Sequence, residues 1–232
     1  MTSNYDENGG HGGVKNDGGS QDCGCCGPSG PGCENMILLG KLPDMDPYEY
    51  NIGAERAVST LGGTSYGNAT DPLFRKLVEV RANDENGDGV IRTNDGVNGR
   101  QAETITHDAD GDGVPENYRV DSTFIVHNTS VTFQNTDGST ETRTLAVRVM
   151  QDNSGNTFLM PPPNGASQEE IEALTSKPIV SVSFPSNRNC YELCHDGIFV
   201  DRSCFPCFVR GTLIETEHGA VAIEDLVPGM RI

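Results

Sequence analysis

The sequence predicts a mainly β protein whose larger part is a loop-rich, antiparallel β domain. Between residues 119 and 160, apolar and polar residues alternate in short runs that are separated by turn-forming residues at 135–138 and 152–155. The 28 glycines, the lack of tryptophan and the aromatic content of 6% indicate many loops around a modest core. A chain of 232 residues can form one sizeable domain or two small ones. These observations favour an antiparallel meander with acidic loops.

Apolar periodicity and the punctuation by Pro, Gly and Asn place the strands and the domain boundaries. Strands are expected at residues 36–42, 124–126, 130–133, 140–150, 157–160 and 179–184. The chain divides into a flexible Gly/Cys-rich tail at 1–34, a β-rich acidic domain at 35–188, a Cys-bearing linker at 189–206 and a separate segment at 207–232. The tail is predicted to be flexible because it contains too few apolar residues to offset the entropy of ordering.

Two short helices are expected among the strands. Ser167, with Glu170 three residues later, forms a capping box that opens a helix, which ends before Pro178. Residues 54–61 are a second candidate. The stretch 71–80 fits two structures, since Asp71-Pro72 is typical of a helix start while the alternation near its end fits a strand.

A first acidic loop matches the spacing of calcium-binding loops. Its oxygen ligands at positions 1, 3, 5, 7 and 12 would be Asp84, Asn86, Asp88, the carbonyl of Val90, and Asp95. A glycine stands at position 6, where the loop turns sharply. Alternate carboxylates wrap one tight turn around a hard cation, and the cation relieves their mutual repulsion. The alternative is a solvated turn, which Asp, Asn and Gly favour in any case.

A second acidic loop has the first half of the same pattern. Its candidate ligands are Asp108, Asp110, Asp112, the carbonyl of Val114, and Glu116. Position 12 is Arg119, so a further ligand would have to come from Asp121 or elsewhere. Because neither loop is followed by a convincing helix, we expect calcium loops set between strands and not a pair of EF-hands. Ca²⁺ is therefore the predicted cofactor.

The charge balance excludes some classes of partner. With 16 basic and 34 acidic residues, the net charge is −18, and no basic cluster suited to nucleic acid occurs. No apolar run reaches the length of a membrane span, and the N-terminus lacks the features of a signal peptide. The compartment stays open, including export by a route that reads a C-terminal signal. The sequence identifies no specific protein or small-molecule partner.

Eight cysteines form two groups. The first group lies in the tail and consists of Cys23, Cys25, Cys26 and Cys33; the second consists of Cys190, Cys194, Cys204 and Cys207. With His195, the second group could hold Zn²⁺. Its irregular spacing makes zinc the weaker prediction, and a disulfide from Cys190 or Cys194 to Cys204 is an open alternative.

The last 26 residues carry a dense motif. It begins Cys-Phe-x-x-Gly-Thr-x-Ile-x-Thr-x-x-Gly and continues Ile-Glu-x-Leu-x-x-Gly. The matching residues are Cys207, Phe208, Gly211, Thr212, Ile214, Thr216, Gly219, Ile223, Glu224, Leu226 and Gly229. This stretch resembles the first block of the Hint (hedgehog/intein) module, an all-β fold, and two short strands around a turn at 217–219 are expected within it.

The resemblance implies a chemistry for one residue. In the family the first cysteine attacks the carbonyl of the preceding peptide bond and converts it into a thioester, which another nucleophile then resolves. By resemblance, Cys207 is the nucleophile and Pro206–Cys207 is the scissile bond, while the acceptor nucleophile is unidentified. The family's later block, with its Thr and His, does not occur within the 232 residues. The 232 residues alone are therefore expected to be inactive.

Two function hypotheses follow. The first is a Hint-type self-processing protein, which would act autocatalytically once its module is complete. The second is an acidic, calcium-binding, exported or surface structural protein that carries a vestigial Hint start. The succession of acidic loops, β-rich stretch and cysteine-bearing linker also resembles, more loosely, the N-terminal regions of bacterial Hint-containing proteins.

Overall fold

The computed structural model describes residues 33–51, 53–94, 103–162, 166–195, 198–199, 213–216, 219–222 and 231. Its strands are β1 (Cys33–Lys41), β2 (Ser65–Tyr66), β3 (Leu77–Asn83), β4 (Val90–Ile91), β5 (Thr104–His107), β6 (Glu116–Gln134), β7 (Thr140–Asp152), β8 (Asn156–Met160), β9 (Ile179–Ser183), β10 (Tyr191–His195), β11 (Ile198–Phe199), β12 (Leu213–Thr216) and β13 (Gly219–Ala222). The helices are α1 (Ala57–Leu61) and α2 (Gln168–Ser176). The mainly β class is confirmed.

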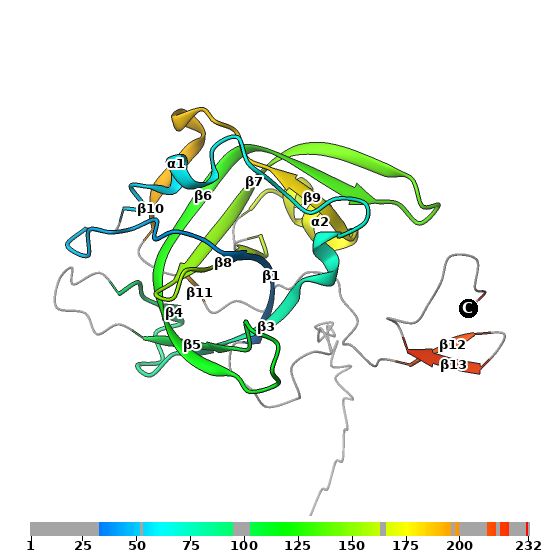
Figure 1. Ribbon diagram of the computed structural model, residues 1–232, viewed down its shortest axis with the longest axis horizontal. Coiled ribbons are helices and arrows are strands. Elements are labelled where there is room, and N and C mark those ends of the chain that lie inside the picture. Colours follow the sequence, from blue (N-terminus) through cyan, green and yellow to red (C-terminus); the bar gives the residue numbers. More distant parts are fainter. Residues whose placement is uncertain are drawn as a thin grey trace, which may run out of the picture.

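Six of the strands form a closed ring (Figure 1). Antiparallel pairings lead from β6 to β5, β3, β1, β8 and β7, and β7 pairs again with β6. Strand β6 closes the ring, because its 19 residues are long enough to pair with β7 along one edge and with other strands along the opposite edge. One edge of β6 follows β7, while the other edge meets β5, β10 and β9 in succession.

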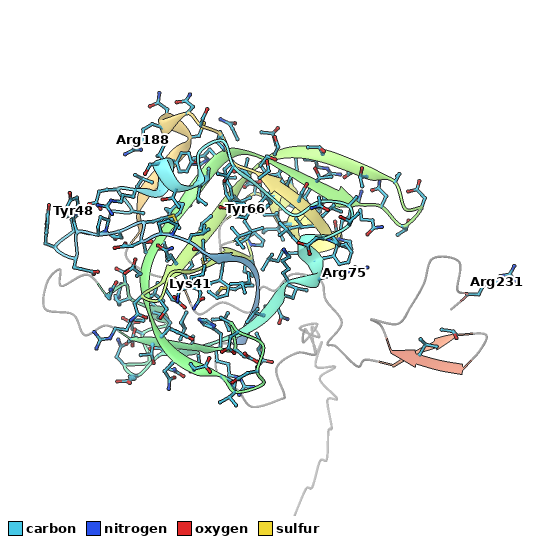
Figure 2. All side chains as sticks on the ribbon, viewed as in Figure 1. Lys41, Tyr48, Tyr66, Arg75, Arg188 and Arg231 are labelled. Atoms are coloured by element: carbon cyan, nitrogen blue, oxygen red, sulfur yellow. The ribbon has the colours of Figure 1, made fainter. Side chains whose placement is uncertain are left out.

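The core divides into two clusters, one on each side of the ring wall. Every ring strand contributes to the smaller cluster, which therefore fills the inside of the ring: Met36, Val80, Ile91, Ile105, Val120, Met150, Phe158 and Met160. The larger cluster lies on the other face and joins the ring to α1, α2, β9 and β10. Figure 2 shows the side chains as sticks on the ring and on the elements beside it. Consequently β8 is buried on both faces.

The structure decides between the alternatives that the sequence left open at residues 71–80. A 3-10 turn, Leu73–Arg75, follows Pro72, and β3 then begins at Leu77. The strand alternative therefore holds for the end of this stretch. The capping box is confirmed, since Ser167 accepts a hydrogen bond from the Glu170 N–H and Glu170 accepts one from the Ser167 N–H. Helix α2 ends at Ser176, before Pro178, as expected.

A buried polar pair lies at the end of β5. His107 Nε2 is 2.8 Å from Asp152 Oδ2, and both side chains are fully buried. The His107 ring stacks on Tyr118 at a centroid distance of 4.3 Å and meets Phe158 edge-on. Asp152 also accepts hydrogen bonds from the turn between β7 and β8, including the N–H of Asn156 at 2.9 Å. The pair thus ties β5 to that turn.

The predicted linker at 189–206 contains strands. Its first part forms β10, which pairs with β6 and so belongs to the main sheet. Farther along, β11 pairs with β4 in a separate two-stranded sheet. No helix in the described part of the chain is long and apolar enough to cross a membrane.

Strands β12 and β13 form an antiparallel hairpin near the C-terminus. Leu213 pairs with Ala222 and Thr216 with Gly219. The hydroxyl of Thr216 donates a hydrogen bond to the carbonyl of Gly219 at 2.7 Å, and Gly219 has a φ of 102°. Two short strands are therefore present in this segment, as the sequence predicts.

Candidate metal centre

The first acidic loop, residues 84–90 (loop 1), connects β3 to β4 and is held by its own side chains. Asp84 accepts hydrogen bonds from the N–H groups of Gly87 and Gly89 at 2.7 and 2.8 Å. Asn86 accepts one from the Asp88 N–H, and Asp88 accepts one from the Val90 N–H. These hydrogen bonds connect positions 1 to 7 of the predicted motif. The loop is therefore a tight turn in which the side-chain oxygens of every second residue, Asp84, Asn86 and Asp88, accept backbone N–H groups.

The two glycines of loop 1 are required by backbone conformation. Gly87 and Gly89 have φ values of 72° and 79°, in the left-handed region. A β carbon on either would meet no other atom within 4 Å, so the requirement lies in the backbone and not in packing. The sharp turn predicted at the sixth position is thus present at Gly89.

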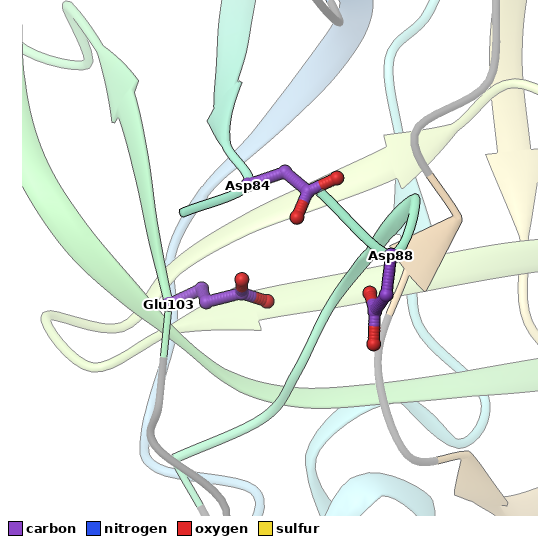
Figure 3. Close-up of side chains that lie close together, drawn as sticks. All are labelled: Asp84, Asp88 and Glu103. Carbon is purple, nitrogen blue, oxygen red and sulfur yellow. The ribbon is translucent and has the colours of Figure 1, made fainter. Parts of the chain in front are cut away.

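Glu103 joins loop 1 from a distant part of the sequence. Strands β3 and β5 pair antiparallel, with Asn83 opposite Thr104. Extending this register by one residue sets Asp84 opposite Glu103. The carboxylates of Asp84, Asp88 and Glu103 offer oxygens within 4.8 Å of one another and face a common space (Figure 3).

Glu103 is unusual because its charged group is buried. The residue is 3% exposed. Its Oε1 lies 3.4 Å from the Asn86 N–H, a long contact, while Oε2 is buried without a hydrogen-bond partner among the described residues. Burying a carboxylate oxygen without a partner costs several kcal/mol, and a cation beside it offsets that cost. The sequence pattern does not predict Glu103 as a ligand.

Among the described residues, the charges around loop 1 do not balance. Three carboxylates converge there, and Arg92 Nη2 lies 2.9 Å from Asp88 Oδ2. One guanidinium against three carboxylates leaves two negative charges in excess, which a divalent cation would match. The motif adds the amide oxygen of Asn86 and the carbonyl of Val90 as expected donors, so one oxygen from each residue would make five protein ligands.

The second acidic loop, residues 108–116 (loop 2), connects β5 to β6 and repeats the geometry of loop 1. Asp108 accepts hydrogen bonds from the N–H groups of Gly111 and Gly113 at 2.7 and 2.8 Å. Asp110 accepts one from Asp112, and Asp112 accepts one from Val114. Position for position, this is the bonding pattern of loop 1. Asp108, Asp110 and Glu116 form a group that could hold a metal ion.

Two titratable groups report the electrostatics of loop 2. Hydrogen bonds from backbone N–H groups, that of Gly113 above all, hold the pKa of Asp108 below its usual value. Burial, and then the negative charge of Glu116, raise the pKa of Tyr118 above 10.0. The Tyr118 hydroxyl lies 3.4 Å from Glu116 Oε2. The phenol is therefore a natural reporter of charge in this loop.

The two loops differ in how they are closed. Loop 1 meets the buried carboxylate of Glu103, whereas loop 2 is largely exposed, with Val114 60% exposed at its tip. Asp121, considered above as a ligand for loop 2, instead accepts a hydrogen bond from Asn94 Nδ2 at 3.2 Å. It is not in the acidic group that forms at loop 2. Asp95, the predicted ligand at position 12 of loop 1, lies outside the described residues.

The candidate residues for self-processing and for zinc fall mostly outside the described residues. Pro206, Cys207 and Cys204 are among them, and of Cys194 and His195 only the backbone is described. Cys190 is a free, buried thiol. Its Sγ accepts a hydrogen bond from Asn128 Nδ2 at 3.5 Å.

The strand β5 connects the two candidate sites. Glu103 precedes its first residue and Asp108 follows its last, so loops 1 and 2 lie at its two ends. The four residues of β5 span roughly 14 Å at 3.4 Å per residue.

Comparison with protein families, with curated proteins and with solved structures finds no match to this chain.

Proposed function

We propose that the described β domain binds calcium at loop 1 and needs the ion for the local order of the ring. The observation that carries this proposal is the buried Oε2 of Glu103, which lacks a hydrogen-bond partner among the described residues and faces Asp84 and Asp88. Calcium suits the site better than magnesium, because the donors come from two separate chain segments. Magnesium demands near-ideal octahedral geometry and retains its water, whereas calcium accepts irregular shells of protein oxygens.

Replacing Glu103 with glutamine tests the proposal. Gln keeps the shape of the side chain but removes its charge, so we expect calcium affinity to fall by about ten- to a hundredfold. The same change removes a buried unpaired charge from the cation-free protein. The melting temperature without calcium should therefore rise, while the upward shift on adding calcium should shrink. Calorimetric titration and thermal melts of the full chain measure both effects.

Glu85→Gln is the matched control, because Glu85 is in the same loop but is exposed and outside the carboxylate group. Its calcium affinity should stay within about twofold of the wild-type value, since an exposed charge in water contributes little. Equal affinities for Glu103→Gln and Glu85→Gln would refute the role of Glu103. An absence of calcium heat in the wild-type protein would refute the site.

Loop 2 is proposed as a second, weaker calcium site, and Tyr118 provides its test. A cation held by Asp110 and Glu116 would offset the negative charges that raise the pKa of Tyr118. The pKa should therefore fall on calcium binding, and tyrosinate absorbance would appear at lower pH. Asp110→Asn should abolish the calcium-dependent part of the shift, whereas Glu103→Gln should retain it. A Tyr118 titration that calcium leaves unchanged would argue against loop 2.

A second proposed function is self-processing at Pro206–Cys207. What supports it is the Hint-like block, together with the hairpin of β12 and β13 at the expected positions. A thiol is the required nucleophile, because a thiolate attacks a carbonyl readily and also leaves readily. In this proposal the domain upstream of Cys207 would be the part that is released.

Intact-mass analysis of the product of the natural reading frame, with and without hydroxylamine, tests the self-processing proposal. Hydroxylamine cleaves thioesters, so a fragment ending at Pro206 should appear or increase. Cys207→Ala should abolish that fragment, whereas Cys190→Ala, which removes a buried thiol, should not. An uncut mass under all conditions would reject self-processing.

A further inference from the structure

Loop 1 continues directly into β4, and this two-residue strand is shared between the candidate site and the core. Val90 is the residue whose carbonyl would face the cation, and its N–H donates to Asp88 Oδ1 at 2.9 Å. The next residue, Ile91, is fully buried in the cluster inside the ring. The position of β4 is thus fixed by packing at one residue and by loop 1 at the other.

The partner of β4 is β11, from the far end of the domain. Phe199 lies opposite Val90 and Ile198 opposite Ile91. In the described part of the chain β11 pairs with no other strand, and Phe199 stands only eight residues before Cys207. A pairing of two residues on each side is marginal alone. The stability of the pairing between β4 and β11 therefore depends on how firmly loop 1 and the core fix the position of β4.

We propose that calcium at loop 1 controls the docking of β11 on β4, and so controls how firmly the chain is held at Ile198 and Phe199. The inference rests on the proposed calcium site. Without the cation, three carboxylates within 4.8 Å of one another repel, and Glu103 is buried while Asp88 is exposed. Movement of the exposed Asp88 side chain toward solvent relieves this repulsion. Because Asp88 accepts the Val90 N–H, that movement draws the start of β4 away from Phe199.

The coupling must act in both directions. If calcium favours the docked state of β11, docking of β11 must raise calcium affinity by the same factor. Couplings of this type typically amount to about five- to a hundredfold. This reciprocity separates the proposal from a simple effect of calcium on overall stability.

Hydrogen exchange of the full chain, followed at the amides of Ile198 and Phe199, tests the docking. Because antiparallel pairs alternate, one of these two N–H groups faces β4, and chelating calcium should accelerate its exchange at least about fivefold. Amides in the ring-facing part of β6 should change little. In Glu103→Gln, at a calcium concentration that saturates only the wild-type protein, chelation should have a much smaller effect on this exchange. Unchanged exchange at these amides, with calorimetric calcium binding intact, would overturn the inference and leave the site standing. A lack of calcium binding would instead refute the proposed function.

The reciprocal experiment perturbs β11 and reads out loop 1. Ile198→Pro removes an N–H and disfavours strand pairing, whereas Ile198→Val keeps the strand. Ile198→Pro should weaken calcium binding by the factor that exchange reports, and Ile198→Val should bind as the wild-type protein does. Equal calcium affinities for the two variants would overturn the proposal. Ile198 is outside loop 1, so a change in calcium affinity must pass through the pairing of β11 with β4.

Discussion

Replacing Asp152 with alanine should destabilise the protein by about 3–5 kcal/mol, because it removes a fully buried carboxylate that accepts hydrogen bonds from several groups. Its Oδ1 accepts hydrogen bonds from the N–H groups of Ser154 and Asn156, and its Oδ2 lies 2.8 Å from both Asn156 Nδ2 and His107 Nε2. Alanine would leave these donors unsatisfied. Among the described residues His107 Nδ1 already lacks a partner, so the buried imidazole would lose its remaining one.

Urea unfolding of the full chain measures this loss as a lower midpoint at an unchanged slope. Asp137→Ala is the matched control, because Asp137 organises the turn between β6 and β7 through Ser139 but is exposed. Water replaces its bonds, so its loss should be much smaller. Asp152→Asn, which keeps an oxygen acceptor, should fall between the two. Similar midpoints for Asp152→Ala and Asp137→Ala would show that burial of the His107 pair contributes nothing.

Gly67→Ala should destabilise the protein by about 3–4 kcal/mol for two separate reasons. Gly67 has a φ of 76°, where a β carbon is strained. Such a carbon would also lie 2.3 Å from the carbonyl oxygen of Val180 and 2.6 Å from Cγ of Leu73. Val180 belongs to β9 and Leu73 is fully buried, so neither can move aside without disturbing the larger core cluster.

Gly138→Ala separates the two reasons. Gly138 has a φ of 82°, close to that of Gly67, but nothing lies within 4 Å of its β carbon position. This variant should therefore lose only about 1 kcal/mol, the cost of the backbone strain. Denaturation of both variants under one set of conditions gives the packing contribution as their difference. Equal losses would mean that β2 and β9 move apart freely to accommodate a methyl group.

Local patterns in the sequence predict much of the fold. The capping box at Ser167, the turn at 135–138 and the strands on either side of it depend on neighbouring residues only, and each is present. The sequence pattern predicts two separate strands within β6, at 124–126 and 130–133, with Asn128 between them. In the structure Asn128 has a φ of 58° within a bulge, and the strand continues through it. Tertiary pairing with β7, β9 and β10 sustains a strand that the local pattern interrupts.

The candidate site could be predicted only in its local part. The spacing of Asp84, Asn86 and Asp88 is visible along the chain, and the structure brings these residues into one turn. Glu103 carries no such pattern, because it reaches the loop through the register of β3 against β5. The isolated acidic residue just before an alternating Thr-Ile-Thr-His strand was the available sign. Its meaning depends on a pairing that the sequence alone does not specify.

Closure of the ring has a consequence for the newly synthesised chain. The β6–β7 hairpin joins residues as close as Gln134 and Thr140, and such local structure forms within about microseconds. Strand β1 must wait for β8, since Ile37 pairs with Leu159 more than a hundred residues later. At about 5–20 residues per second, a ribosome needs on the order of ten seconds to deliver that partner. During this interval one edge of β1 is open to pairing with other chains, so the protein is most prone to aggregation before the ring closes.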